Sequence, residues 1–290
     1  MSVTALPRVS PRRRRTDKVM RSLLLVATLI ALVPLVFIIY YLLHKGLSAV
    51  TSSGFFSTDP NGNFFGNPGG IRSAILGTLE MIALATAISV PVGIAVALYL
   101  TEYGKESKFA NVIRYFVDVM TGVPSIVFGL FIYIVLVISK IGGAFTGWKG
   151  AVAISLLMLP IVIRSSEVVL LLVPSSLREA ALALGAPRWR VMLRVVLPTS
   201  LSGLVTGSLL AVARGMGETA PLLFTAAGAF ALTGNLGAQM NALPIQIYND
   251  IQSPRNAITA RAWGAGLTLV ALVLIINVIA RIASRRSRMA

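Results

Sequence analysis

The sequence lacks cysteine altogether and has one histidine, His44, among its 290 residues. Without thiols it has no disulfide, cysteine nucleophile or cysteine-ligated metal, and one histidine cannot build a histidine-based metal site or catalytic triad. Charged residues are also scarce, at 12% against the usual quarter in soluble domains. Together with a hydrophobic content of 56%, these absences indicate an integral membrane protein.

Nucleotide-binding and hydrolytic motifs are missing as well. The only Gly-Lys pair, Gly104 and Lys105, has Tyr99 where a P-loop requires its first glycine. No HExxH, GxSxG or paired-carboxylate cluster occurs. We therefore expect no ATPase site, no catalytic residues, no metal site and no cofactor in this chain.

Long apolar runs divide the sequence, and each is long enough to cross the hydrocarbon core of a bilayer as a helix. The six runs cover residues 22–43, 73–100, 115–138, 151–173, 197–223 and 263–282. We expect an all-α membrane domain of six spans, with a disordered basic tail at residues 1–21 and a second basic tail at 283–290. A cleaved signal peptide is the alternative for the first run, but its apolar core should be only 7 to 15 residues long.

Basic residues are sorted by membrane side. The net charge of +16 would suggest nucleic-acid binding in a soluble protein. With the N-terminus inside, 18 of the 26 Lys and Arg residues fall on the internal side, six on the external side and two within spans. By the positive-inside rule this predicts a multi-pass protein of the cytoplasmic membrane with both termini cytoplasmic, in contact with lipid and not with nucleic acid.

A charged amphipathic stretch, residues 174–198, separates the fourth and fifth runs on the predicted cytoplasmic side. Ser176 and Glu179 have the spacing of a capping box, and Gly185 followed by Pro187 is a helix stop. The pattern predicts a short helix with one apolar stripe, formed by Leu177, Ala180, Ala181 and Leu184. Such a helix needs a surface to lie on. Lipid headgroups or a soluble partner are both possible from the pattern alone.

The run EAALALGAPRWRVMLRVVLP, residues 179–198, resembles the cytoplasmic signature loop of ABC-importer membrane subunits. Val195 stands where that loop usually has isoleucine. The resemblance implies the type I importer permease fold, also called MetI-like. It also implies that Glu179, Ala180, Ala181 and Gly185, with Leu177 and Leu184, couple the permease to a separate ATPase that binds ATP and Mg²⁺.

A narrower resemblance, to the PstA family of phosphate-importer permeases, covers nearly the whole chain after the first run. It rests on five segments, GTLEMIALATAISVPVGIAVALYLTEYG, VPSIVFGLFIY, RSSEVVLLLVPSSLREAALALGAPRWR, ARGMGETAPLLFTA and ALPIQIYN. The resemblance implies translocation of inorganic phosphate. It implies three partners: an ATPase subunit (PstB-like), a second permease (PstC-like) as heterodimer, and an extracytoplasmic phosphate-binding protein (PstS-like).

Two arginines lie inside predicted spans, where each needs an acidic partner, a water-filled cavity or a ligand. Arg164 precedes Glu167 by three residues and Arg214 precedes Glu218 by four, so each pair shares a helix face. A guanidinium fork suits a tetrahedral oxyanion. We expect these four residues to line the substrate path. The alternative is two ion pairs that only hold helices together.

Two other intramembrane carboxylates have no assigned role. Asp118 lies near the start of the third run, where it can be solvated, and Glu80 lies within the second. Physical reasoning indicates an anion, and only the resemblance indicates phosphate. A permease for another oxyanion (sulfate or molybdate) and a stand-alone secondary anion transporter are the competing functions.

Overall fold

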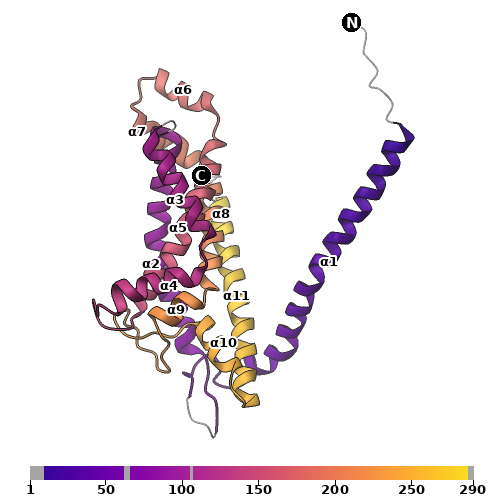
Figure 1. Ribbon diagram of the computed structural model, residues 1–290, viewed down its shortest axis with the longest axis vertical. Helices are drawn as coiled ribbons and strands as arrows, with labels where there is room; N and C mark the ends of the chain where they lie inside the picture. The colour runs from indigo at the N-terminus through magenta and orange to yellow at the C-terminus, as the bar shows by residue number, and fades with distance from the viewer. Residues whose placement is uncertain (1–9, 62–65, 105–106, 287–290) are drawn as a thin grey trace.

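Long helices run side by side through most of the computed structural model, which describes residues 10–61, 66–104 and 107–286 (Figure 1). No β-strand forms in these ranges, so the all-α prediction is confirmed. Five helical segments of the described chain are long and apolar enough to cross a membrane. They are Arg12–Val50 in α1 (Pro11–Val50), α2 (Arg72–Leu98) with its extension η1 (Tyr99–Tyr103), α5 (Gly147–Leu171), Arg188–Met216 and Asn256–Ile282 in α11 (Asn256–Arg286). The segment Arg188–Met216 consists of α7 (Arg188–Val191), η3 (Met192–Val196) and α8 (Leu197–Met216).

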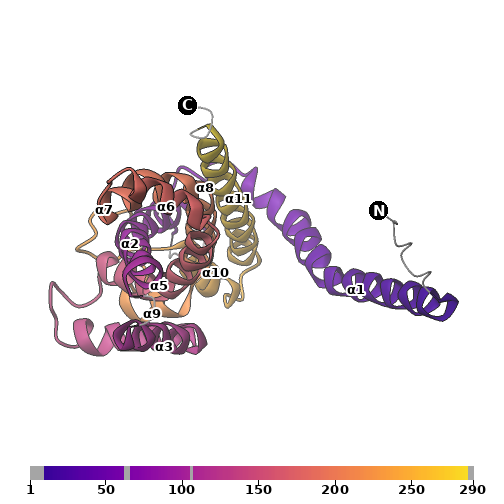
Figure 2. The same cartoon turned by 90° about the horizontal axis from the view of Figure 1, so that it is seen from above.

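Helix α1 begins much earlier than its apolar run. Residues 11–21, expected to be disordered, are helical here, with Pro11 in the first turn, where its missing amide costs nothing. Residues 1–9 of that basic tail lie outside the described residues. The helix leans away from the rest of the protein and meets α11 near its C-terminal end, where Tyr41 stacks on Trp263 with ring centroids 6.4 Å apart (Figures 1 and 2).

The third apolar run is not one helix. It consists of α3 (Lys108–Gly122), then α4 (Ser125–Ile132) with η2 (Tyr133–Val137), and the two parts meet at an angle of 104°. Pro124 causes the break, since it restricts Val123 to extended backbone (ψ 130°) and then starts α4. The described chain therefore has six spans if this bent pair counts as one.

The fifth run is also interrupted. Helix α8 ends at Met216, and the short helix α9 (Ala220–Thr225) follows after three residues. Helices α4 and α9 pack together so closely that a Cβ on Gly129 would lie 2.6 Å from the Cα of Pro221. The helices that follow the two interruptions therefore pack directly against each other.

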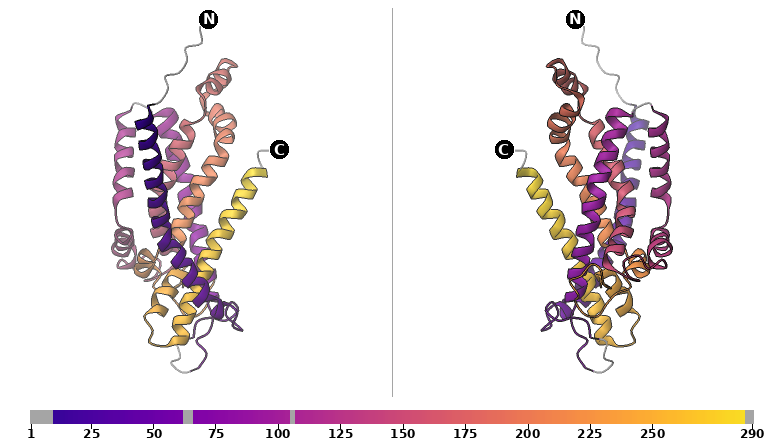
Figure 3. Two further views of the ribbon diagram at one scale, coloured as in Figure 1. Left: turned by 90° about the vertical axis from the view of Figure 1, so that its right-hand side faces the viewer. Right: turned by 90° about the vertical axis from the view of Figure 1, so that its left-hand side faces the viewer.

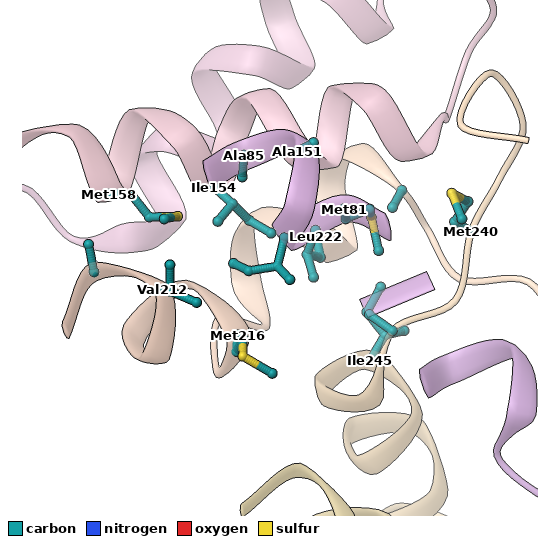
Figure 4. Packing of buried hydrophobic residues seen from close by; sticks show 14 of the residues in the cluster. Met81, Ala85, Ala151, Ile154, Met158, Val212, Met216, Leu222, Met240 and Ile245 are labelled. Atoms are coloured by element: carbon teal, nitrogen blue, oxygen red, sulfur yellow. The ribbon is translucent and has the colours of Figure 1, made fainter. Parts of the chain in front are cut away.

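The core lies between α2, α5 and α8 (Figure 4). Gly203 and Gly207 allow α8 to approach α5, because a Cβ on either would lie 2.5 Å from Val169 or Ser165 respectively. Small residues spaced by four in this way are typical of close helix contacts in membranes. The labelled core side chains are Met81, Ala85, Ala151, Ile154, Met158, Val212, Met216, Leu222, Met240 and Ile245.

A buried polar network closes the end of the bundle opposite α6 (Ser175–Ala183). Arg261 of α11 donates two hydrogen bonds of 2.7 Å to the carboxylate of Asp250 in α10 (Leu243–Ile251), and both side chains are about 95% buried. Gln246 donates to the same carboxylate at 2.7 Å and accepts from Asn241 at 2.6 Å. Through this network α10, which includes the segment LPIQIYND, ties α11 to the chain before it.

The start of α1, helix α6 and the end of α11 lie at one end of the molecule, and the chain that follows α1 lies at the other (Figures 1 and 3). Because the chain has no cysteine, single cysteines can test this topology. In cells that express this chain alone, we expect a membrane-impermeant maleimide to label Ser57→Cys directly and Leu184→Cys only after permeabilisation. Labelling of Leu184→Cys in intact cells would contradict the predicted orientation.

Candidate functional site

Helix α6 is the short helix predicted within residues 174–198, but it starts differently from the prediction. Pro174 is the N-cap and Ser175 the first helical residue, and no side chain caps this end. The expected capping box of Ser176 and Glu179 is therefore wrong, because the helix begins one residue earlier than the box requires.

The C-terminal end of α6 agrees with the prediction. Gly185 has a φ of +79°, the left-handed conformation that favours glycine. Its amide donates to Leu182 at 2.9 Å and the amide of Ala186 donates to Ala181 at 3.2 Å. These two bonds form a Schellman motif, which fixes the direction in which the chain leaves α6.

The predicted apolar stripe of α6 faces away from the helix bundle. No residue of α6 is buried, and the Leu184 side chain at its C-cap is 90% exposed. Leu177, Glu179 and Ala180 are also exposed, whereas Ala181 packs partly against the cluster beneath. An exposed leucine and alanine surface on a short helix is typical of a docking element.

An ion pair that sequence reasoning missed anchors α6 to the bundle. Arg178 donates from Nε to Oε1 of Glu102 at 2.9 Å, and its two other nitrogens donate to the backbone oxygens of Val173 and Leu170. The Arg178 and Glu102 side chains are only 15% and 7% exposed. The partners are 76 residues apart in sequence, so no helical spacing could have predicted the pair.

Arg164 lies in a cluster of four charged side chains that joins α3 to α5. It donates to Glu167 at 2.7 Å, as the i,i+3 spacing predicted, and also to Asp118 and to the backbone oxygen of Arg114. Glu167 accepts a second bond, of 2.9 Å, from Arg114. Two arginines and two acids balance in charge, which is how ionised groups are stabilised in a region of low dielectric constant.

Arg214 and Glu218 lie at the interruption between α8 and α9. Their closest atoms are 3.5 Å apart, and the Arg214 side chain is 58% exposed whereas Glu218 is 13% exposed. This contact is long for a charge-assisted hydrogen bond, so Arg214 keeps donors free for another anion. Glu80, on α2, is half-buried and takes part in none of the ion pairs found in the described ranges.

The two arginines do not meet. Gly207 of α8 faces Ser165, the neighbour of Arg164, and seven residues separate it from Arg214. At 1.5 Å per residue this places Arg214 about 10 Å deeper along α8. A groove of about 1010 Å³ between α5, α8 and α11 includes Arg164 in its lining but not Arg214. Any path that uses both arginines therefore passes them one after the other.

A separate ion pair lies at the far end of the molecule from α6. Arg72 donates two hydrogen bonds, of 3.1 and 2.9 Å, to Asp59, which also accepts from the amide of Leu232 at 3.2 Å. The hydrogen bond from Arg72 lowers the pKa of the Asp59 carboxyl below its usual value. This pair fixes the loop that follows α1.

The sequence is similar to those of known transport proteins. Residues 89–289 match the family model of the binding-protein-dependent transport system inner membrane component. The chain is 39% identical over 270 residues to the phosphate transport system permease protein PstA of Haemophilus influenzae, covering 93% of this chain and 94% of that protein. It is 40% identical over 270 residues to PstA of Yersinia pestis, covering 93% of this chain and 90% of that protein. It is 38% identical over 284 residues to PstA 1 of Mycobacterium tuberculosis, covering 96% of this chain and 92% of that protein.

Solved structures share the fold. The inward-facing MetNI methionine ABC transporter matches with a TM-score of 0.53 at 20% identity, covering 76% of this chain and 94% of that chain. A bacterial alginate ABC transporter in complex with an alginate-loaded periplasmic protein matches with a TM-score of 0.58 at 15% identity, covering 95% of this chain and 96% of that chain. These likenesses confirm the MetI-like permease fold.

The charge cluster predicts unequal effects of removing its two acids. Glu167→Ala leaves two partly buried guanidinium groups without their shared carboxylate, and we expect it to lower the free energy of unfolding by about 3 kcal/mol or more. Asp118→Asn, at a side chain that is 62% exposed, should cost less than about 1 kcal/mol. Unfolding in mixed detergent micelles measures the free energy of unfolding of both variants. Equal losses would show that the cluster does not hold α3 through Glu167.

Proposed function

This chain belongs to the family of binding-protein-dependent transport system inner membrane components, and within it to the PstA permeases, and on that premise we propose that it is a membrane-spanning subunit of an ABC importer for inorganic phosphate. The observation that carries the proposal is about 40% identity to phosphate permeases over 93% of the chain. Bilayer-length helices and an exposed short helix between the fourth and fifth runs are the parts that such a subunit needs.

Arg214 is the residue we assign to the phosphate. Its exposed guanidinium, at the break between α8 and α9, offers a planar fork of donors to two phosphate oxygens. Glu218 is close enough to compete for that guanidinium, which keeps phosphate from binding too tightly to be released. A glutamate can also accept the proton of monohydrogen phosphate, a proton that sulfate lacks.

Arg164 and Glu167 form a second proposed contact site for phosphate along the substrate path. Arg164 is one-third exposed and lines the groove between α5, α8 and α11, while Glu167 and Asp118 hold its charge. Its ion pairs also support the alternative that it only joins helices. The unfolding measurements above measure that structural role, and uptake by Arg164→Lys tests the role in transport.

Helix α6 is the proposed docking element for an ATPase on a separate chain. Leu177 and Leu184 provide apolar anchors, and Glu179 provides a charge on the same exposed helix. Gly185 sets the exit angle of the chain, so that closure of the ATPase would move α6 together with the segments on either side. ATP and Mg²⁺ would be bound entirely by that partner.

Two further partners complete the proposed importer. A second permease of PstC type would form a heterodimer with this chain, and an extracytoplasmic PstS-like protein would deliver phosphate to the end that carries Asp59 and Arg72. We propose the cytoplasmic membrane as the location, with both termini and α6 on the side of the ATPase.

Affinity purification of this chain from its native membranes tests the proposal. We expect it to recover a nucleotide-binding subunit and a second permease, and the reconstituted complex to take up labelled phosphate with ATP. Sulfate or molybdate that competes better than phosphate would favour a permease for another oxyanion. Uptake by the purified chain without an ATPase would favour the stand-alone transporter.

Arg214 offers a residue-level prediction. A charge-assisted hydrogen bond contributes about 1.5 to 3 kcal/mol, so we expect Arg214→Ala to lower phosphate uptake about 10- to 100-fold. Arg214→Lys keeps the charge but not the planar fork of donors. We expect its phosphate uptake to lie between that of Arg214→Ala and that of the wild type. Both are measured in cells with equal amounts of protein in the membrane. Unchanged uptake by Arg214→Ala would exclude the assigned path.

A further inference from the structure

We propose that the ion pair between Arg178 and Glu102 transmits the movement of α6 to the second span, and that both are positioning residues for coupling to the ATPase. Helix α6 continues covalently into α5 on one side and into α7, η3 and α8 on the other. The second span ends at Tyr103, 72 residues before α6 begins at Ser175, and has no such covalent connection. This inference rests on the proposed function, and it extends the coupling machinery to a residue outside residues 174–198.

Arg178 is the only residue of α6 whose side chain makes hydrogen bonds within the described ranges. Its other bonds go to the backbone oxygen of Leu170, in the last turn of α5, and to that of Val173, between α5 and α6. Its bond to Glu102 is the one that leaves this local segment. Apart from the apolar cluster that Ala181 shares with Ala97 of α2, a displacement of α6 therefore reaches the second span directly through this one guanidinium.

Glu102 is well placed to receive that displacement. It lies in η1, a π-helical segment that directly continues α2, and π-helical segments often mark functional positions in helices. The same segment is held from a second side, because Arg114 of α3 donates to the backbone oxygen of Leu100 at 2.9 Å. The cytoplasmic end of α2 is thus bound to α3 by one arginine and to α6 by another.

The burial of the pair makes it a stiff connection. Both side chains are at least 85% buried, and a guanidinium and a carboxylate with so little access to water cannot exchange their partners for solvent without a large cost. Exposed ion pairs, by contrast, open readily. The pair borders a cavity of about 410 Å³ that is also lined by Leu182 and Arg188, so α6 has room to tilt around it.

The first test separates coupling from folding in the reconstituted complex. Glu102→Ala removes the carboxylate and leaves the bonds of Arg178 to the backbone oxygens of Leu170 and Val173 in place. We expect it to lower the phosphate transported per ATP hydrolysed about tenfold, while ATP hydrolysis continues. Glu80→Ala is the matched control, because it removes another carboxylate of the same span, one that takes part in none of the ion pairs of the described residues. This control should leave the ratio unchanged.

The second test restores the connection without the charges. The chain has no cysteine, so Glu102→Cys with Arg178→Cys can be joined selectively by a short bismaleimide through the cavity beside them. The double variant should be uncoupled before cross-linking and regain at least half of the wild-type ratio afterwards. A wild-type ratio in Glu102→Ala, or no recovery on cross-linking, would overturn the inference. If the wild-type complex itself transports no phosphate, the proposed function fails instead.

Discussion

Charge inside an apolar environment is the constraint on which the arrangement of this protein depends. An ionised group in the hydrocarbon region must be paired or lie against water, and the backbone there must be hydrogen-bonded. The described chain meets this demand with arginines that reach across helices. Arg114 and Arg164 share Glu167, Arg178 binds Glu102, and Arg261 binds Asp250. Each of these three carboxylates joins two elements. Apolar packing is not directional, so these ion pairs fix how the two elements are oriented relative to each other.

The positions of these pairs divide the protein into a rigid part and a part that can respond. The Arg261–Asp250 pair is about 95% buried and tied to Gln246, which makes the end of the bundle opposite α6 a fixed support. At the end that carries α6, Arg178 holds this helix, which has no buried residue. In between, Arg214 is 58% exposed beside Glu218 at a break in the helix. A site that must bind and release an anion needs such incomplete pairing, whereas a support does not.

Interrupted helices give this arrangement its second feature. Pro124 turns the third run by 104°, and α8 stops at Met216 before α9. Irregular backbone is tolerated within a membrane where it is covered by protein or faces water. Here the helices that follow the two breaks, α4 and α9, pack against each other at Gly129 and Pro221, and Arg214 is exposed beside the break between α8 and α9. Glycine at position 129 is required because a side chain there would occupy the space of the Pro221 backbone.

Local chemistry in the sequence was enough to determine the all-α class, the apolar runs, the sorting of basic residues and the stop of α6 at Gly185, because hydropathy, charge and glycine conformation act within a few residues. The i,i+3 and i,i+4 pairs of Arg164 and Arg214 followed in the same way. Only the tertiary structure decided that Arg164 also binds Asp118, that Glu167 is shared with Arg114, and that Glu102 binds Arg178. Helical spacing reaches four residues along the chain, and these partners are 46 to 76 residues apart. Which helices become neighbours depends on how whole helix surfaces pack. The local sequence around a charged residue therefore does not determine a partner that lies on another helix.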